Sequence, residues 1–118
     1  MAAKDELGRH GEEYALTYLT AAGYQLIDRN WRCAQGEIDL IVAQDGEVVF
    51  VEVKTRSSVR FGHPFEAITA VKLARLRRLA YAWCAEADPP PRRIRIDAVA
   101  VVAEPGAEPV VEHRQGLF

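Results

Sequence analysis

Apolar and polar side chains alternate along two runs near the middle of the chain, at 36–43 and 47–54. Alternation of this kind predicts β-strands with one covered face. Between the runs, Asp45-Gly46 favours a two-residue type I′ turn, which needs positive φ at both central positions. The pattern therefore predicts an antiparallel hairpin with a defined register.

One face of this hairpin is predicted to be wholly apolar, while the other carries charges. The register places Asp39 opposite Glu52 on the charged face. On the same face, Glu37 lies opposite Lys54. The apolar face comprises Ile38, Leu40, Val42, Val49, Val51 and Val53. Directly opposed like charges destabilise a sheet, and buried charges are costly unless they are paired or bind a metal. The acidic pair therefore favours a divalent-cation site, and a solvated strand face with alternating charges is the alternative.

Spacing along the rest of the chain predicts two helices and further strands. Apolar residues recur every three or four positions at about 3–22 and 64–87, as they do in amphipathic helices. Alternating stretches at 24–32 and 92–102 predict strands, and 110–113 suits a short edge strand.

The predicted fold is α/β, with the order α-β-β-β-α-β and a final short strand. About four to five strands would form a mixed sheet flanked by the two main helices. A chain of 118 residues suits one domain, so we expect a single domain of residues 1–118. Its core would span about 7–102, followed at 103–118 by a turn, the edge strand and a loosely held tail.

Composition is ordinary for a soluble globular protein, with 49% hydrophobic and 27% charged residues. No apolar run approaches the ~20 residues of a membrane span, and the start of the chain lacks the apolar run of a signal peptide. Cys33 and Cys84 lie far apart, which suits reduced thiols better than a disulfide or a zinc site. We therefore expect a cytoplasmic protein that does not enter the membrane.

Charge is unevenly distributed, although the net charge is only −2. Between Lys54 and Arg95 the chain has ten basic and three acidic residues. A basic segment directly after the acidic pair favours one phosphate-binding surface. A solvated, arginine-rich helix face is the alternative.

Three blocks of the sequence resemble a known family. They are GxxGExxA (Gly8, Gly11, Glu12, Ala15), GEIDLI from Gly36 and VFVEVKTR ending at Arg56. In this order and spacing the blocks closely resemble the bacterial YraN-like family. That family is largely uncharacterised and is related to archaeal Holliday-junction resolvases.

The same blocks contain a wider signature. Asp39 followed by Glu52-Val53-Lys54 is similar to the D…(D/E)-x-K pattern of the restriction-endonuclease-like superfamily. Residue 38 is the one departure, because Ile38 stands where the superfamily motif has proline. The resemblance covers about 7–102 and implies a restriction-endonuclease-like core.

The resemblance implies a Mg²⁺- or Mn²⁺-dependent endonuclease that hydrolyses DNA phosphodiester bonds. Asp39 and Glu52 would hold the metal together with the carbonyl of Val53. Glu12 would join the metal site or position a water. Lys54 would orient or help deprotonate the attacking water, or offset the charge of the phosphate. An exposed helix glutamate is the alternative for Glu12.

Residues around this centre are expected to support it or to bind the substrate. Glu37 would fix the position of Lys54, and Arg56, Arg60 and Lys72 would bind the nucleic-acid backbone with little sequence discrimination. For Lys72, an apolar stem at the edge of the helix core is the alternative. The resemblance favours DNA over RNA, branched or recombination intermediates as substrates, and a homodimer that cuts two strands.

Two other polar residues are interpreted as structural. His63 lies in a loop and has no second histidine or cysteine at ligand spacing. Asp97 lies in an apolar strand and is expected to pair with an arginine rather than bind a metal.

Two other classes of function remain open from the sequence. The first is a module that docks on DNA, or on a helicase or recombination protein, without cutting. The second is a small-molecule or protein-only role in which the acids form a structural ion-pair network.

Overall fold

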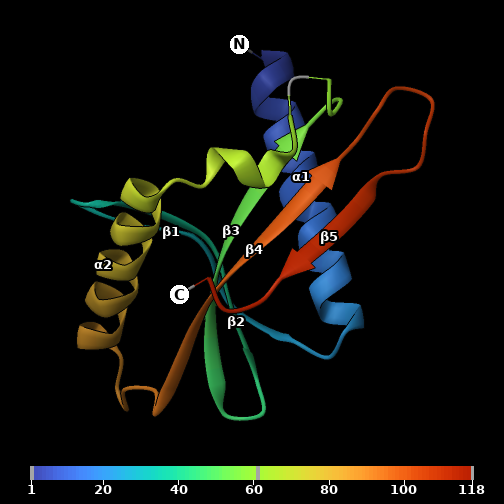
Figure 1. Cartoon of the computed structure of the whole chain (residues 1–118). Helices are drawn as coiled ribbons and strands as arrows, with labels where there is room; N and C mark the ends of the chain where they lie inside the picture. The colour runs from blue at the N-terminus through green and yellow to red at the C-terminus, as the bar shows by residue number, and fades with distance from the viewer. Residues whose placement is uncertain (1, 61, 118) are drawn as a thin grey trace.

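The chain forms a mixed β-sheet with a helix on each face (Figure 1). The computed structural model describes residues 2–60 and 62–117, with side chains from residue 6 onward. The elements are α1 (Ala2–Ala21), β1 (Gln25–Cys33), β2 (Gly36–Gln44), β3 (Glu47–Arg56), the 3₁₀ helix η1 (Pro64–Ala67), α2 (Ala70–Glu86), β4 (Arg93–Val102) and β5 (Val110–Arg114). The five strands of the described chain lie in the order β1-β2-β3-β4-β5. Only β3 and β4 pair in parallel, because the crossover through α2 joins them. This architecture confirms the predicted α/β fold and element order.

Alternation along the central strands divides the core between the two faces of the sheet. Ala15 and Leu19 of α1 pack on one face. Leu76 and Leu79 of α2 pack on the other. In β4, Val99 and Val101 face α1, while Ile96, Ala98 and Ala100 face α2 or η1. Successive residues of this strand therefore face opposite sides of the sheet, as the alternation at 92–102 predicted.

The central hairpin has the predicted register. The pairs of β2 and β3 run from Gln44–Glu47 beside the turn to Leu40–Val51. Asp45 and Gly46 form the turn with φ of 52° and 79°, as a type I′ turn requires. Asp39 and Glu52 come directly after the last pair, at the end of the hairpin away from the turn.

One predicted face is wrong, because Ile38 does not share a face with Leu40. Leu40 packs with the α1 cluster, whereas Ile38 packs with the α2 cluster. Strand β1 makes the same change, since Arg29 reaches α1 and Trp31 packs with the α2 cluster. Regular strands keep residues i and i+2 on one face, so both strands must rotate between these positions.

The rotation occurs at Asn30 of β1 and Asp39 of β2, which stand opposite each other between two paired positions. Asn30 has a φ of 53°, in the left-handed region, and this conformation interrupts the alternation. The Asp39 side chain takes the place of a ladder bond, because its Oδ2 accepts a hydrogen bond of 2.7 Å from the Val53 backbone N–H. Beyond this point Gly36 lies against Leu79 of α2. The end of β2 thus departs from β3, and the acidic pair lies where they separate.

The second predicted helix is divided in two. Residues 64–67 form η1, and α2 begins only at Ala70. Thr69 has an extended backbone and caps α2, since its hydroxyl accepts a hydrogen bond from the Lys72 N–H. His63 caps η1, because its Nδ1 accepts from the Phe65 N–H at 3.0 Å. The histidine therefore has the structural role expected of it.

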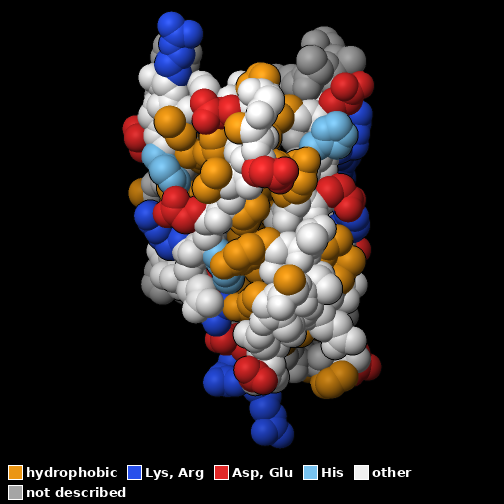
Figure 2. Space-filling model, turned by 90° about the vertical axis from the view of Figure 1, so that its right-hand side faces the viewer, with side chains coloured by type: hydrophobic (Ala, Val, Ile, Leu, Met, Phe, Trp, Pro, Cys, Tyr) orange, Lys and Arg blue, Asp and Glu red, His pale blue; other side chains and the backbone are white. Residues whose placement is uncertain are grey.

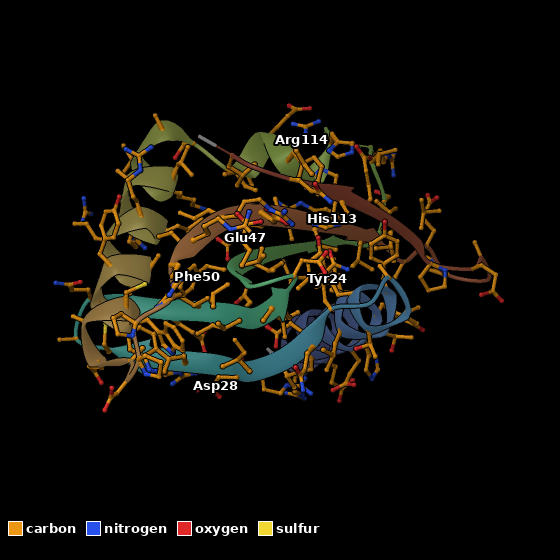
Figure 3. All side chains as sticks on the ribbon, turned by 90° about the horizontal axis from the view of Figure 1, so that it is seen from below. Tyr24, Asp28, Glu47, Phe50, His113 and Arg114 are labelled. Atoms are coloured by element: carbon orange, nitrogen blue, oxygen red, sulfur yellow. The ribbon has the colours of Figure 1, made fainter. Side chains whose placement is uncertain are left out.

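A buried polar network holds the end of the chain to the sheet. Asp97 is fully buried and accepts two hydrogen bonds from Arg95, at 2.8 and 2.9 Å. The carboxylate also bonds His113 Nε2 at 2.7 Å and accepts from the Gly116 N–H at 3.0 Å. Figure 3 shows His113, Tyr24 and Glu47 around this place, and Arg95 donates to the latter two. The expected Asp97–arginine pair is present. The tail was expected to be loosely held, but it is bonded to β4 through residue 117.

The surface over α1 and β5 includes apolar side chains interspersed with charged ones (Figure 2). Tyr14, Tyr18 and Val110 are among the exposed large apolar residues of these elements. The Tyr18 ring meets His113 edge-on with 5.9 Å between ring centroids, so it covers the buried network from outside. No helix in the described part of the chain combines the length and apolar character needed to cross a bilayer.

Candidate functional site

Three of the predicted site residues meet where β2 separates from β3. Asp39 comes from β2, while Glu52 and Lys54 lie two residues apart on one face of β3. The carboxyl groups of Asp39 and Glu52 share a hydrogen bond. The Lys54 Nζ lies 3.7 Å from the Glu52 Oε2. The structure thus brings the two acids and the lysine into one group.

The environment of Asp39 disfavours its charged form. Burial, the hydrogen bond with Glu52 and the Glu52 charge raise the pKa of Asp39 to about 9, against a smaller opposing effect of the Val53 N–H. Asp39 therefore keeps a proton at neutral pH when no cation is present. A divalent cation would replace that proton and remove the repulsion between the carboxylates.

The acidic pair lies in a recess of about 230 Å³ between the hairpin and α2. Its lining comprises Glu37, Asp39, Glu52, Lys54, Lys72, Arg75, Leu76 and Leu79. Lys72 and Arg75 belong to the first turns of α2, whose start is fixed by the Thr69 cap. The charge of Lys54 lowers the pKa of Lys72, so the two ammonium groups face a common space. A phosphate placed there would relieve this repulsion.

Two broader depressions continue from the recess toward α1. One, of about 860 Å³, is lined by Gly8, Arg9, Glu12, Asn30, Arg32, Glu37 and Lys54. The other, of about 340 Å³, is lined by Leu7, Gly8, Glu12, Val53, Lys54, Thr55, Arg56 and Ser57. Lys54 borders all three spaces. The predicted residues Glu12, Glu37 and Arg56 therefore lie around the same lysine.

Glu12 belongs to the electrostatic surroundings of the acidic pair. Burial raises the pKa of Glu12, a hydrogen bond from Asn30 opposes this rise, and the nearby charge of Glu37 adds to it. The charge of Glu12 in turn raises the pKa of Asp39. The structure thus places Glu12 beside the predicted metal ligands, on a different element.

Gly11 allows this approach of α1 to the sheet. A Cβ at residue 11 would collide with the Thr55 hydroxyl and lie 2.8 Å from Thr55 Cβ. At Gly8, by contrast, a Cβ would meet nothing within 4 Å. Of the two helix glycines, only Gly11 is therefore required for close packing.

Gly11→Ala should lower the free energy of unfolding by about 1–3 kcal/mol, because overpacking at a rigid contact outweighs the better helix propensity of alanine. Gly8→Ala is the matched control and should be neutral or stabilising by up to about 1 kcal/mol. Urea unfolding of both variants measures the difference. Equal effects at the two positions would contradict the assigned close contact.

Other predicted residues have partners or positions that the sequence did not indicate. Glu37 accepts a hydrogen bond of 3.0 Å from the Arg32 Nε, whereas Lys54 has its ion pair with Glu52. Arg60 lies in the loop after β3 and is outside the residues that line the three spaces.

The expectation of one basic surface from Lys54 to Arg95 is wrong. Glu47 pairs with Arg93, and Lys54 pairs with Ala100. Because β3 and β4 are parallel, the arginines at the start of β4 lie at the opposite end of the sheet from the acidic pair. Arg95 instead belongs to the buried network.

Sequence reasoning missed two arginines that line the larger of the two depressions. Arg9 lies three residues before Glu12 on α1, and Arg32 lies on β1 two residues after Asn30. Neither belongs to the basic segment of the sequence. The only available signal was helical spacing from Glu12, which would have placed Arg9 on a neighbouring position of the same helix face.

The donor set suits a hard cation held by few protein ligands. The described residues hold no group of three or more His, Cys, Asp or Glu side chains placed to bind one ion. Mg²⁺ does not need such a group, because it keeps several waters and is usually bound by one or two carboxylates and by phosphates. Asp39 and Glu52, with the adjacent backbone of Val53, therefore fit Mg²⁺ or Mn²⁺ better than zinc.

Comparison with other proteins identifies relatives over nearly the whole chain. The model of a family described as the uncharacterised protein family UPF0102 matches residues 11–101. A UPF0102 protein of Beutenbergia cavernae is 56% identical over 99% of both chains. Relatives in Pseudarthrobacter chlorophenolicus and Frankia alni are 50% and 49% identical, over 99% and 100% of this chain and 89% and 98% of their own lengths. These matches confirm the family resemblance inferred from the sequence blocks.

Proposed function

We propose that this chain, which belongs to the uncharacterised protein family UPF0102, is a Mg²⁺- or Mn²⁺-dependent nuclease that hydrolyses DNA phosphodiester bonds. The observation that carries the proposal is the Asp39–Glu52 pair in a recess lined also by Lys54 and Lys72. Asp39, which keeps a proton beside Glu52, is poised to exchange that proton for a cation, and two mutually repelling lysines are poised to accept a phosphate. A metal ion bound to a phosphate would supply both the cation and the anion.

The residues have separable roles in this proposal. Asp39 and Glu52 would hold the cation, together with the Val53 carbonyl, and the Val53 N–H fixes the orientation of Asp39. When bound, the ion lowers the pKa of a water and offsets charge that develops on the phosphate. Lys54 borders the recess and both depressions, so it orients the attacking water or a phosphate oxygen. Glu12 would join the metal site or position that water.

Substrate binding would depend on the sugar–phosphate backbone rather than on the bases. Lys72, Arg75 and Arg56 line the spaces around the acidic pair and can neutralise successive phosphates. Such contacts give salt-dependent affinity with little sequence discrimination. We further propose branched or recombination intermediates as substrates and a homodimer that cuts two strands, as the YraN-like resemblance implies.

The test is cleavage of single-stranded, linear, flapped and four-way DNA with Mg²⁺, Mn²⁺ or a chelator. Glu52→Gln and Lys54→Met should reduce the rate by about 10²–10⁴-fold, because each removes a group that acts on the reacting atoms. Glu108→Gln changes an exposed loop residue in the same way and should leave the rate unchanged. Equal cutting by every variant would identify a contaminating nuclease.

A DNA-binding or docking module without catalysis is the second candidate. The basic side chains of Lys54, Lys72 and Arg75 around the recess favour it, because they can bind phosphate without a metal. Under this alternative the lysines and arginines around the recess bind phosphate, and Asp39 stays protonated. Salt-dependent DNA binding without cleavage in either metal would replace the nuclease with this module.

A further inference from the structure

Asn30 has a backbone conformation that its place in the chain does not require. Asn30 and Asp45 are non-glycine residues with positive φ in the described chain, at 53° and 52°. Asp45 belongs to the type I′ turn, which needs that conformation. Asn30 lies inside β1, where left-handed residues are unfavourable. Strain of this kind persists where the surrounding structure imposes it, and it concentrates at functional sites.

The conformation changes where the Asn30 side chain lies. Arg29 of β1 contacts α1 through an ion pair of 2.7 Å with Glu13. In a regular strand the next side chain would point to the opposite face. Asn30 instead lines the same depression as Glu12, and its side chain is close enough to lower the pKa of that carboxyl group. Consecutive residues of β1 therefore contact consecutive residues of α1.

The position of Asn30 relative to the acidic pair is equally specific. By register it stands opposite Asp39 on the neighbouring strand, between the paired positions at 29–40 and 31–38. The Asp39 side chain turns toward Val53 on β3, and the Asn30 side chain turns toward α1. Asn30 thus connects Glu12 to the part of the sheet that carries the metal ligand.

We propose that Asn30 is a positioning residue, whose left-handed backbone directs its carboxamide to Glu12 and holds that carboxylate at the edge of the divalent-cation site. The inference rests on the proposed function and adds a residue to it. A carboxamide suits the task, because its N–H can donate to one carboxylate oxygen and leave the other for a metal-bound water. Aspartate at this position would repel Glu12, and glycine would keep the backbone but lose the donor.

The competing explanation is that residue 30 serves only the change of face in the strand. Asn30→Gly separates the two, because glycine adopts positive φ without strain. Asp45→Gly is the matched control, since it makes a comparable change of backbone preference in a turn at the far end of the hairpin. If only the backbone conformation matters, both variants should behave like the native protein.

The experiment has three readouts: Mn²⁺ binding by calorimetry, thermal unfolding in chelator, and kcat and KM for DNA cleavage. Each is measured on the full-length native protein, Asn30→Gly, Glu12→Gln, the double variant and Asp45→Gly. Asn30→Gly should unfold at or above the native temperature in chelator. Its Mn²⁺ affinity or kcat should fall by about 10–100-fold, as for other residues that orient metal-site groups, with KM for DNA little changed. Glu12→Gln should cause a similar loss, and the double variant should lose no more than either.

Native Mn²⁺ affinity and kcat in Asn30→Gly would overturn the inference, as would losses that add in the double variant. If native protein binds no Mn²⁺, the proposed nuclease function fails and the metal role of Asn30 fails with it. If native protein binds Mn²⁺ and cleaves DNA while Asn30→Gly does both equally well, only the inference about Asn30 fails.

Discussion

Replacing Asp97 with asparagine should lower the free energy of unfolding by about 3 kcal/mol at neutral pH, since it leaves the Arg95 charge without its buried partner. Asp97 is fully buried and accepts hydrogen bonds from Arg95 and Gly116, besides its bond to His113. Burial by itself would raise the pKa of Asp97, but these hydrogen bonds outweigh it and lower that pKa below the ordinary value of 3.8. Asp97 therefore contributes stability that is present above about pH 4 and is lost as pH falls through its lowered pKa.

Urea unfolding of native protein and Asp97→Asn between pH 3 and pH 7 measures this effect. The gap in stability should be full at pH 7 and should narrow toward pH 3. Asp28→Asn is the matched control, because Asp28 is exposed and bonds only its neighbour's N–H in the described contacts. A loss for Asp97→Asn no larger than that of the control would show that the network is not needed for folding.

The parts of the fold that the sequence predicted are those set by local chemistry. Asp45-Gly46 dictates a two-residue turn, and the turn alone fixes which residues of β2 and β3 are paired. The apolar alternation of β4 likewise predicts its two faces. Asp97 could be assigned an arginine partner because Arg95 lies two residues away on the same face of one strand. His113 could not be predicted, because β5 brings it there from a distant part of the chain.

The change of face at Asn30 and Asp39 could not be read from alternation. Strict alternation assumes that every residue of the strand is extended, so it cannot predict a left-handed residue inside the strand. Asparagine tolerates the left-handed conformation, but the sequence does not show where tertiary contacts favour it. Ile38 was consequently placed on the wrong face. The consequence for the site is direct, since the same rotation separates β2 from β3 and leaves room beside the acidic pair.

The site itself was predicted as far as it depends on the hairpin. Asp39, Glu52 and Lys54 meet because register and alternation bring them together. The basic surroundings depend instead on how distant elements pack, so Arg9 and Arg32 were missed and the arginines of β4 were assigned to the wrong end of the sheet. The parallel pairing of β3 and β4 follows from the crossover between them, so it could not be predicted from the distribution of charge along the sequence.

Asp39→Asn should make the metal-free protein more stable at pH 8, although it should abolish metal-dependent cleavage. In native protein the pKa of Asp39 is raised to about 9 from an ordinary 3.8, chiefly by burial and then by Glu52. Between these values the folded state keeps a proton that the unfolded state has released. Stability should therefore fall as pH rises across this range, and level off above it. Asparagine can accept the Val53 N–H and does not titrate, so the variant should lack this slope.

Chemical unfolding in chelator from pH 5 to pH 9 distinguishes the two proteins, with Asp45→Asn as the same substitution at an exposed turn. Adding Mg²⁺ should then make the native protein more stable than the variant. The cation binds the folded native protein, so stability rises with Mg²⁺ concentration above the dissociation constant. The variant binds the cation less tightly and gains less. Parallel pH profiles for native protein and Asp39→Asn would contradict a protonated Asp39 in the native protein. If the native protein loses stability at alkaline pH and Mg²⁺ restores it, the two carboxylates repel each other in the folded protein at the position where a cation would bind. A structural ion-pair network would not contain such repulsion, whereas a catalytic metal site keeps it.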